Sequence, residues 1–473
     1  MFYKSVLNYF KNDKINYKKV LLIVFIVSLA IRLLFGILIF NKGDTSQFKG
    51  DNDHWDYINY AKNIISQGIF VPDIEKLNKG MSTPDGLRGT NASFVGPGFP
   101  LIIAFVFKIF GENYLSLLVL IVLNALVSSL LCVLIFYIGR ELFNEQVGLF
   151  ASIWSIFYIS FIRYSPTLYK ENWIVFLFPL IIFLFLKETK RKKISLYSLI
   201  LFSILYAYFI HMDERFFTYF PVLLMGFVFL DRDSWKKGLQ KAFVFFSLVV
   251  ILMIPWLTRN FNVYNRVVIL TERTAVFTDK IFGYKDEIEK VKNKKEKELA
   301  VLEKVSQLIL EGKEVPPAVV RNLHALVEIE YLEPLKKAIK LGYIPHRYSR
   351  LEKWVADFKQ FWRPFRFSGG FIGDGYRFVG PSWSLKHNLV SCLNYGWILP
   401  FFIIGILIIL KNKDKYGIFI TLIIVIHTCI HVILAYALRR YRIPIDAFVM
   451  IIAFYGLQQL YVKFQDWKMS KVR

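Results

Sequence analysis

The feature that most constrains the fold is an apolar run near the N-terminus. Residues 20–40 form a run of 21 positions with a single charge, Arg32. At about 1.5 Å per helical residue, such a run crosses a hydrocarbon core of about 30 Å. It is too long for a cleaved signal peptide, and no small-residue cleavage site follows it. Similar runs recur to the end of the chain, and 55% of all residues are hydrophobic. We therefore expect a helical membrane protein rather than a soluble one.

The apolar segments predict about ten membrane spans. The expected spans are 20–40, 114–138, 146–162, 172–186, 194–210, 216–230, 242–257, 393–410, 416–437 and 443–462. One further segment, 96–111, is continuously apolar over only about 13 residues, which is too short to cross. We expect it to be a re-entrant or interfacial helix on the outer side. The predicted fold class is an all-α polytopic membrane protein.

Lysine-rich connections predict the orientation of these spans. They are the N-terminal segment 1–19, the connections 187–193, 231–241 and 411–415, and the C-terminal tail. All five fall on one side if both termini are cytoplasmic, as the positive-inside rule requires. Counting 96–111 as a span would put the later lysine clusters outside. The net charge of +24 then indicates cytoplasmic loops and contact with anionic lipid, and we expect no nucleic-acid partner.

This topology divides the chain into three parts. Residues 1–257 form an N-terminal transmembrane module whose first outer loop carries the expected site. Residues 258–392 form a large outer loop domain between spans 7 and 8, which is partly helical. Its highly charged stretch, 285–314, is read as a solvated insertion rather than a binding tail. Residues 393–473 form a C-terminal transmembrane module.

Cysteine and histidine patterns predict no metal centre. Cys132, Cys392 and Cys429 lie in or beside apolar runs and have no metal-binding or disulfide spacing. His427 and His431 stand four residues apart in a predicted span and could form a metal-binding pair. A third ligand is missing from this pattern, so packing is the favoured interpretation.

The first expected outer loop contains a dense cluster of carboxylates. Residues 53–65 predict an amphipathic helix with Asp53, Tyr57, Tyr60 and Ile64 on one face. Asp53 could simply cap this helix. Asp51 and Asp53 also have the D-x-D form, which could hold a divalent ion between sugar and phosphate. The residues alone leave both interpretations open.

The motifs around this helix resemble those of the integral-membrane GT-C glycosyltransferases. The most similar branch is family 39, which includes protein O-mannosyltransferases and aminoarabinose transferases. The matching positions are Asp53, Tyr57, Ala61 and Gly68 in the first loop, "PGFP" at 97–100, "KIFG" at 108–111, Asn124, "GRELF" at 139–143, Glu171 in the second outer loop, "PWLTRN" at 255–260 and "RRYRIPIDAF" at 439–448. The resemblance covers roughly residues 20–270 and 393–462.

The resemblance implies a transferase that uses a polyprenyl-phosphate-linked sugar. Asp53 would be the general base that takes the proton from the acceptor hydroxyl. His54 stands where the family often has a second acidic residue, so the partner of Asp53 is not defined. The basic residue expected before the Pro-Gly motif is absent, and Arg88 could replace it. Tyr57 and Asp51 are further candidates for substrate contact. Asp56 lies off the helix face that carries Asp53 and Tyr57, and we assign it a structural role.

Cations at the outer ends of spans are candidates for binding the donor phosphate. Arg439, Arg440 and Arg442 cluster on the side where positive residues are normally depleted. The arginine fork suits phosphate oxygens, although anchoring to lipid headgroups would also explain the cluster. Arg215 and Arg259 are secondary candidates.

Two further features of the outer side have both a functional and a structural interpretation. Glu171 could accept a proton or orient a substrate group, or it could form a salt bridge with Lys170. The polar patch 211–215 could be functional at membrane depth, or it could be a hairpin tip in water.

The predicted enzyme is an extracytoplasmic hexosyl- or pentosyltransferase of the cell membrane. Its partners would be the lipid-linked donor, a protein, lipid or glycan acceptor, and membrane lipids. No cofactor is required apart from the divalent ion that Asp51 and Asp53 could hold. A flippase for lipid-linked sugars is the alternative of another class, but it should show internal repeats, and we find none. An oligosaccharide polymerase or ligase of related architecture is a third option.

Overall fold

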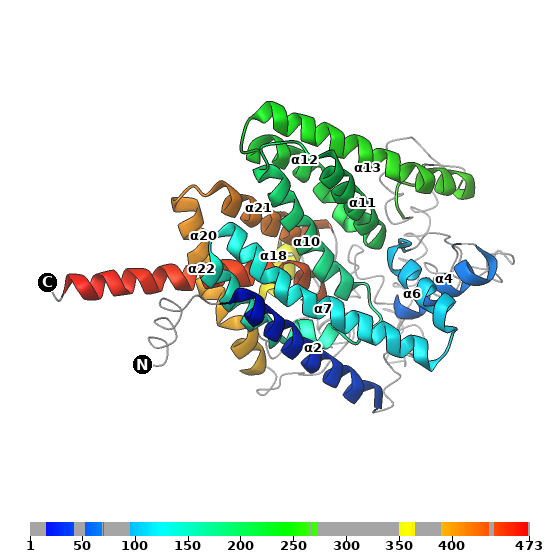
Figure 1. The fold of residues 1–473 in the computed structure, drawn as a ribbon, viewed down its shortest axis with the longest axis horizontal. Coiled ribbons are helices and arrows are strands. Elements are labelled where there is room, and N and C mark those ends of the chain that lie inside the picture. Colours follow the sequence, from blue (N-terminus) through cyan, green and yellow to red (C-terminus); the bar gives the residue numbers. More distant parts are fainter. Residues whose placement is uncertain are drawn as a thin grey trace, which may run out of the picture.

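The computed structural model describes residues 16–41, 53–68, 70, 95–264, 267–271, 350–364, 389–434 and 439–471. Every regular element within these residues is a helix (Figure 1). Asp51, Arg88 and the charged stretch 285–314 lie outside them. The elements are α2 (Tyr17–Asn41), α4 (Asp53–Gln67), α6 (Gly98–Phe110), α7 (Tyr114–Leu142), α8 (Glu145–Ile156), α9 (Ile159–Tyr164), α10 (Glu171–Lys190), α11 (Leu196–Met212), η1 (Glu214–Thr218), α12 (Tyr219–Leu230), α13 (Trp235–Tyr264), α18 (Arg350–Trp362), η3 (Cys392–Gly396), α20 (Ile398–Lys411), α21 (Lys415–Cys429), η4 (Ile430–Leu434) and α22 (Arg439–Ser470).

Seven helices in the described part of the chain are long and apolar enough to cross a membrane. They are the spans Tyr17–Leu38, Tyr114–Leu142, Glu171–Lys190, Trp235–Asn262, Leu389–Lys411, Lys415–Ile433 and Arg440–Ser470. The all-helical character expected from the sequence is therefore confirmed for these residues, and seven helices have the length and composition of membrane spans. Each of the ten expected segments contains helix, but 146–162 is divided between α8 and α9, and α12 is shorter than its expected span. The count of ten spans and the membrane position of α6 remain predictions.

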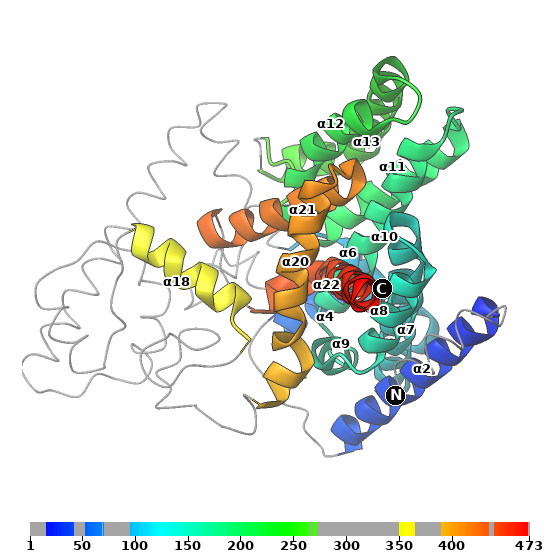
Figure 2. The same ribbon diagram turned by 90° about the vertical axis from the view of Figure 1, so that its left-hand side faces the viewer.

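The helices differ in how much of their surface is buried by protein. Within their most apolar windows, α10 and α22 are 67% buried, whereas α2 and α13 are only 28% buried. Figure 2 shows α22 nearly end-on, with α20 on one side and α7, α8 and α10 on the other. Apolar side chains left exposed on α2 and α13 suit contact with lipid tails. The bundle is thus built around α22, and α2 and α13 lie at its rim.

A buried arginine joins α2 to the break between α8 and α9. Arg32 is 0% exposed, and its Nε donates to the hydroxyl of Ser128 on α7 at 2.7 Å. Its two terminal nitrogens donate to the carbonyl oxygens of Ser155 and Ile156 at 3.4 Å. These carbonyls lie in the last turn of α8, where the helix leaves acceptors unpaired and its dipole is negative. The broken helix therefore stabilises the charge, and the charge in turn caps the broken helix.

The start of α6 is held close to the end of α11 by glycine. A Cβ placed on Gly98 would lie 2.8 Å from backbone atoms of Met212, and one on Gly96 would lie 2.0 Å from the carbonyl oxygen of His211. The hydroxyl of Tyr208 also donates to the Gly98 carbonyl oxygen at 2.9 Å. This close approach explains why the Pro-Gly motif uses glycine. It also packs the start of α6 directly against residues 211 and 212.

Candidate active site

The first-loop helix forms where the sequence predicts it. The predicted range 53–65 corresponds to α4, Asp53–Gln67. Tyr57 and Tyr60 are buried, with the Tyr57 ring edge-on to Phe99 at 5.2 Å and the Tyr60 ring stacked on Phe70 at 4.3 Å. The predicted face is therefore confirmed as the packed side of the helix. Asp53 is the first residue of α4, and its side chain lies outside the described set.

A residue in the first turn of α4 contacts the segment that precedes α10. His54 is 1% exposed, and its ring is edge-on to that of Tyr169 with centroids 6.0 Å apart. Two residues after Tyr169, Glu171 begins α10. A helix N-terminus carries partial positive charge and favours anions, including the Glu171 carboxylate. The two predicted acidic positions, 53 and 171, are therefore each the first residue of a helix.

Lys170 pairs with the loop after α11 rather than with its neighbour Glu171. Its Nζ lies 3.3 Å from Oδ2 of Asp213, whose side chain is fully buried. The Arg215 guanidinium donates two hydrogen bonds to the same carboxylate, one of them from Nε to Oδ1 at 2.8 Å. Among the described residues, no Lys170–Glu171 salt bridge forms, so that interpretation of the sequence was wrong. The buried patch at 211–215 is also not a hairpin tip in water.

Two cations fix the charge of Asp213. Burial alone would raise the pKa of this carboxyl, but Arg215 and Lys170 lower it well below its usual value. The pKa of Arg215 is raised in turn, because the effect of Asp213 exceeds that of burial. Asp213 and Arg215 therefore stay charged across the physiological range.

Tyr441 lies between Arg215 and Arg440, and Arg440 contacts Glu171. The Arg215 guanidinium lies over the Tyr441 ring at 4.0 Å, and that of Arg440 lies over the same ring at 5.0 Å. Arg440 also donates from Nη2 to the Tyr441 hydroxyl at 2.9 Å, and its Nε lies 3.6 Å from Oε1 of Glu171. The other carboxylate oxygen of Glu171, Oε2, is buried and accepts no hydrogen bond from the described residues.

His427 contacts the backbone of Tyr441 through one ring nitrogen and the side chain of Tyr219 through the other. Its Nε2 lies 2.6 Å from the Tyr441 carbonyl oxygen, which can only accept, so Nε2 carries the proton. Its Nδ1 then accepts from the hydroxyl of Tyr219 at 2.8 Å. Both ring nitrogens are thus engaged by protein atoms. The His431 ring stacks on Tyr441 at 5.1 Å, which agrees with packing.

The other predicted cations take different positions. Arg442 is buried and donates from Nε to Oδ1 of Asp446 at 2.8 Å, and Nη1 donates to the Phe361 carbonyl oxygen at 3.1 Å. The Arg259 guanidinium lies 5.0 Å over the Trp256 ring and donates to the Phe70 carbonyl oxygen at 2.6 Å. Arg439 begins α22, but its side chain is not described. The Arg439–Arg442 cluster is thus divided, with Arg440 facing Glu171 and Arg442 facing inward.

Five predicted residues therefore lie near one end of the bundle, and four separate segments supply them: His54 from α4, Lys170 and Glu171 from the start of α10, Arg215 from η1 and Arg440 from α22. Asp213 and Tyr441, which hold this cluster together, were not among the predicted site residues. Asp213 had a signal, because it sits inside the polar patch noted from the sequence. Tyr441 had no sequence signal apart from its place between arginines. Aromatic residues are common at the ends of membrane spans, so its type alone does not mark a site.

Comparisons with known proteins agree with this architecture. Residues 95–258 match the family described as dolichyl-phosphate-mannose-protein mannosyltransferase. The apo oligosaccharyltransferase of Archaeoglobus fulgidus matches with a TM-score of 0.57 at 16% identity, over 97% of this chain and 52% of that one. The predicted GT-C resemblance is confirmed.

Two further solved structures are similar to this chain. The Archaeoglobus fulgidus protein AglB, solved with an inhibitory peptide and a dolichol-phosphate, matches with a TM-score of 0.54 at 15% identity, over 96% of this chain and 51% of that one. ArnT from Cupriavidus metallidurans matches with a TM-score of 0.46 at 10% identity, over 86% of this chain and 55% of that one. The chain thus spans about half the length of these structures. No curated protein matches it at a significant level.

The family match covers one part of the candidate site. It includes Lys170, Glu171, Asp213 and Arg215 but begins after α4, so Asp53 lies outside it.

Proposed function

We propose that this protein transfers a sugar from a polyprenyl-phosphate donor to an acceptor hydroxyl at the outer face of the cytoplasmic membrane. The single observation that carries the proposal is the contact of Arg440 with Glu171 and Tyr441, beside the helix that Asp53 begins. A carboxylate for the acceptor and cations for a phosphate meet there. Such a pairing is what transfer from a sugar phosphate requires. The GT-C fold and the mannosyltransferase match support the same reaction class.

Each group has a role in the proposed step. Asp53 takes the proton from the acceptor hydroxyl, and the oxygen forms a bond to the anomeric carbon. The bond from that carbon to the phosphate oxygen breaks, and the electron pair leaves with the polyprenyl phosphate. Arg440 and Arg215 offset the charge of this leaving group, because a guanidinium fork matches phosphate oxygens. Glu171 accepts a substrate hydrogen bond through Oε2. Inversion at the anomeric carbon is expected.

A divalent ion at Asp51 and Asp53 is part of the proposal but not essential to it. Carboxylate oxygens are the ligands that Mg²⁺ prefers, so the residue types fit such an ion. When bound, it would supply positive charge beside the donor phosphate. The sugar and the acceptor, whether protein, lipid or glycan, are left open by these residues.

The test is Asp53→Asn in membranes supplied with radiolabelled polyprenyl-phosphate sugars. We expect transfer to fall by about 10²–10⁴-fold, the usual contribution of a positioned base. Asp56→Asn is the matched control, because Asp56 lies on the same helix off the predicted face, and it should retain transfer. EDTA treatment in the same assay reports on the ion. Transfer by Asp53→Asn at the parental rate would refute the assignment of the base.

The alternative of a flippase makes a different prediction in the same membranes. A flippase would move the lipid-linked sugar across the bilayer without consuming it. Release of free polyprenyl phosphate that depends on Asp53 therefore distinguishes transfer from translocation. A polymerase or ligase would also release this product, and the identity of the acceptor product separates it from a single-sugar transferase.

A further inference from the structure

The turn at residues 139–143 resembles a family motif, yet the proposed reaction does not use it. Its residues form the last turn of α7 and the first residue of the connection to α8. A Cβ on Gly139 would lie 2.6 Å from the Cα of Gly148, so glycine lets the two helices cross closely. Phe143 stacks on Tyr455 of α22 with ring centroids 3.9 Å apart. These two positions therefore join three helices.

A third position of the turn holds α10. Glu141 pairs with Lys187 at 2.6 Å and with Lys190 at 2.9 Å. Arg140, in contrast, forms no ion pair with any carboxylate in the described part of the chain. Its guanidinium lies 5.0 Å over the ring of Tyr137, one turn back on its own helix. The turn thus has one charged side chain without an ion-pair partner among the residues that the structure describes.

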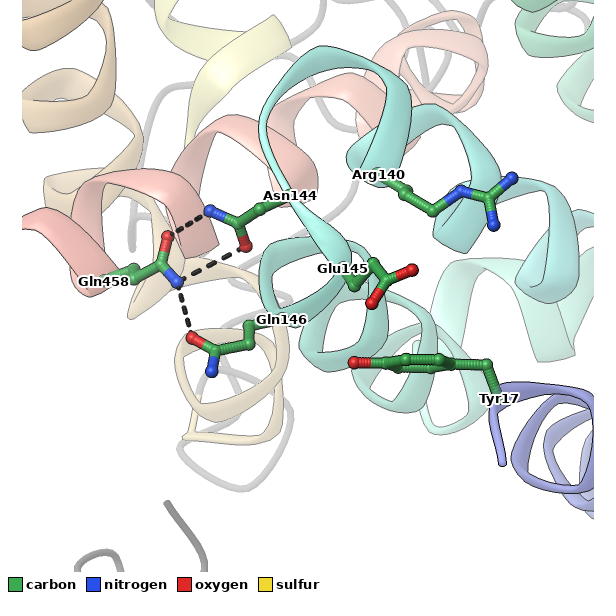
Figure 3. Close-up of a pocket in the computed structure, with 6 residues that line it drawn as sticks. All are labelled: Tyr17, Arg140, Asn144, Glu145, Gln146 and Gln458. Carbon is green, nitrogen blue, oxygen red and sulfur yellow. Dashed lines mark hydrogen bonds between the residues drawn. The ribbon is translucent and has the colours of Figure 1, made fainter. Parts of the chain in front are cut away.

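Arg140 lines a cavity of about 440 Å³. The six lining residues are Tyr17, Arg140, Asn144, Glu145, Gln146 and Gln458, which come from α2, α22 and the α7–α8 region. Figure 3 shows three amides together on one side of the cavity, and Arg140, Glu145 and Tyr17 on the other. Hydrogen bonds join the three amides, because Gln458 accepts from Asn144 and donates to Gln146, both at 2.8 Å. One wall of the cavity is therefore fixed before any ligand enters.

The position of the cavity points to a lipid. α7 has 29 residues, so its two ends are about 43 Å apart, and the cavity lies at the end opposite to α6 and the candidate active site. Tyr17 begins α2, the helix at the rim of the bundle. The next turn of α2 exposes Leu22 and Ile23, at 58% and 59% of their surface. A molecule in the cavity with a polar head could therefore lay apolar chains along α2.

We propose that this cavity binds the headgroup of a membrane phospholipid that carries both a phosphate and a hydrogen-bond donor. The phosphate pairs with Arg140, whose fork binds phosphate oxygens bidentately. Glu145 accepts from the ammonium or hydroxyl of the headgroup, which makes phosphatidylethanolamine a suitable ligand and phosphatidylcholine a poor one. The site is separate from the proposed transfer chemistry and does not depend on it.

The experiment measures lipid binding by the purified full-length protein in detergent. Native mass spectrometry counts bound phosphatidylethanolamine, and thermal unfolding reports the stabilisation that it gives. Arg140→Gln should weaken binding by about tenfold, because a charge-assisted hydrogen bond contributes about 1.5–3 kcal/mol. Lys463→Gln, which removes an exposed cation of α22 outside the cavity, should bind as the parent does. Glu145→Gln should lose the preference for phosphatidylethanolamine over phosphatidylcholine.

Three results would overturn the proposal. The first is equal lipid binding by Arg140→Gln and the parent. The second is displacement of the lipid by inorganic phosphate, which would assign the cavity to a soluble anion. The third is equal binding of diacylglycerol, which lacks the phosphate. An unchanged unfolding midpoint of lipid-free Arg140→Gln shows that the variant is folded, and Arg140→Lys, which keeps the charge without the fork, should bind at an intermediate level.

Discussion

Neighbouring arginines in the segment 439–448 have different surroundings, and the difference decides their chemistry. Arg440 is 27% exposed and contacts Glu171 at the end of the bundle. Arg442 is only 5% exposed and forms a buried pair with Asp446, which also accepts from the hydroxyl of Tyr158 at 2.7 Å. An exposed cation can exchange its partner for a phosphate at small cost. A buried pair cannot, because removing one partner leaves an uncompensated charge.

This contrast gives a prediction for two substitutions. Arg440→Gln should raise the KM for the lipid-linked donor by about tenfold or more, with little change in thermal stability, because a charge-assisted contact to phosphate is lost. Arg442→Gln should lower the free energy of unfolding by about 3–5 kcal/mol, because Asp446 is left buried without its cation. Donor titrations and thermal unfolding in detergent measure the two effects. A parental KM for Arg440→Gln would remove this residue from the donor site.

At the scale of elements, the site depends on how closely α6 approaches α11. The carboxylate of Asp213 follows directly after the residues against which Gly96 and Gly98 pack. Any side chain at position 98 must push these two segments apart, since the neighbouring atoms are backbone and cannot change rotamer. The glycine of the Pro-Gly motif is therefore part of the support of the polar cluster.

Gly98→Ala tests this role of the close approach. We expect it to destabilise the protein by about 1–3 kcal/mol, the usual cost of overpacking, and to lower the transfer rate. Lys108→Ala is the control, because Lys108 is exposed on the same helix. Thermal inactivation of transfer activity measures both variants. Equal half-inactivation temperatures for Gly98→Ala and the parent would show that α6 can shift without cost.

At the scale of the whole molecule, the proposed function requires the polar cluster and the lysine-rich turns to lie on opposite sides of the membrane. α10 connects the two regions, with Glu171 at its start and Lys190 at its end. Its 20 residues rise by about 30 Å, which matches the hydrocarbon thickness. The fold is compatible with the predicted orientation, and a labelling experiment decides it.

Single cysteines at positions 53 and 192 test the topology. In a variant with Cys132, Cys392 and Cys429 replaced by serine, a membrane-impermeant maleimide added to intact cells should label Asp53→Cys but not Lys192→Cys. Permeabilised cells should give labelling at both positions, which controls for accessibility. Labelling of both positions in intact cells would place them on the same side and contradict the proposed arrangement.

The sequence by itself determined the fold class, the positions of the helices and the packed face of α4. These are local properties, because the length of an apolar run and the 3.6-residue period can be read within a short window. The tertiary structure alone decided which charges meet. Lys170 pairs with Asp213 rather than Glu171, and Arg440 faces Glu171 while Arg442 faces Asp446. Such pairings depend on distances between residues far apart in the chain, and only the packing of α10, α11 and α22 sets those distances.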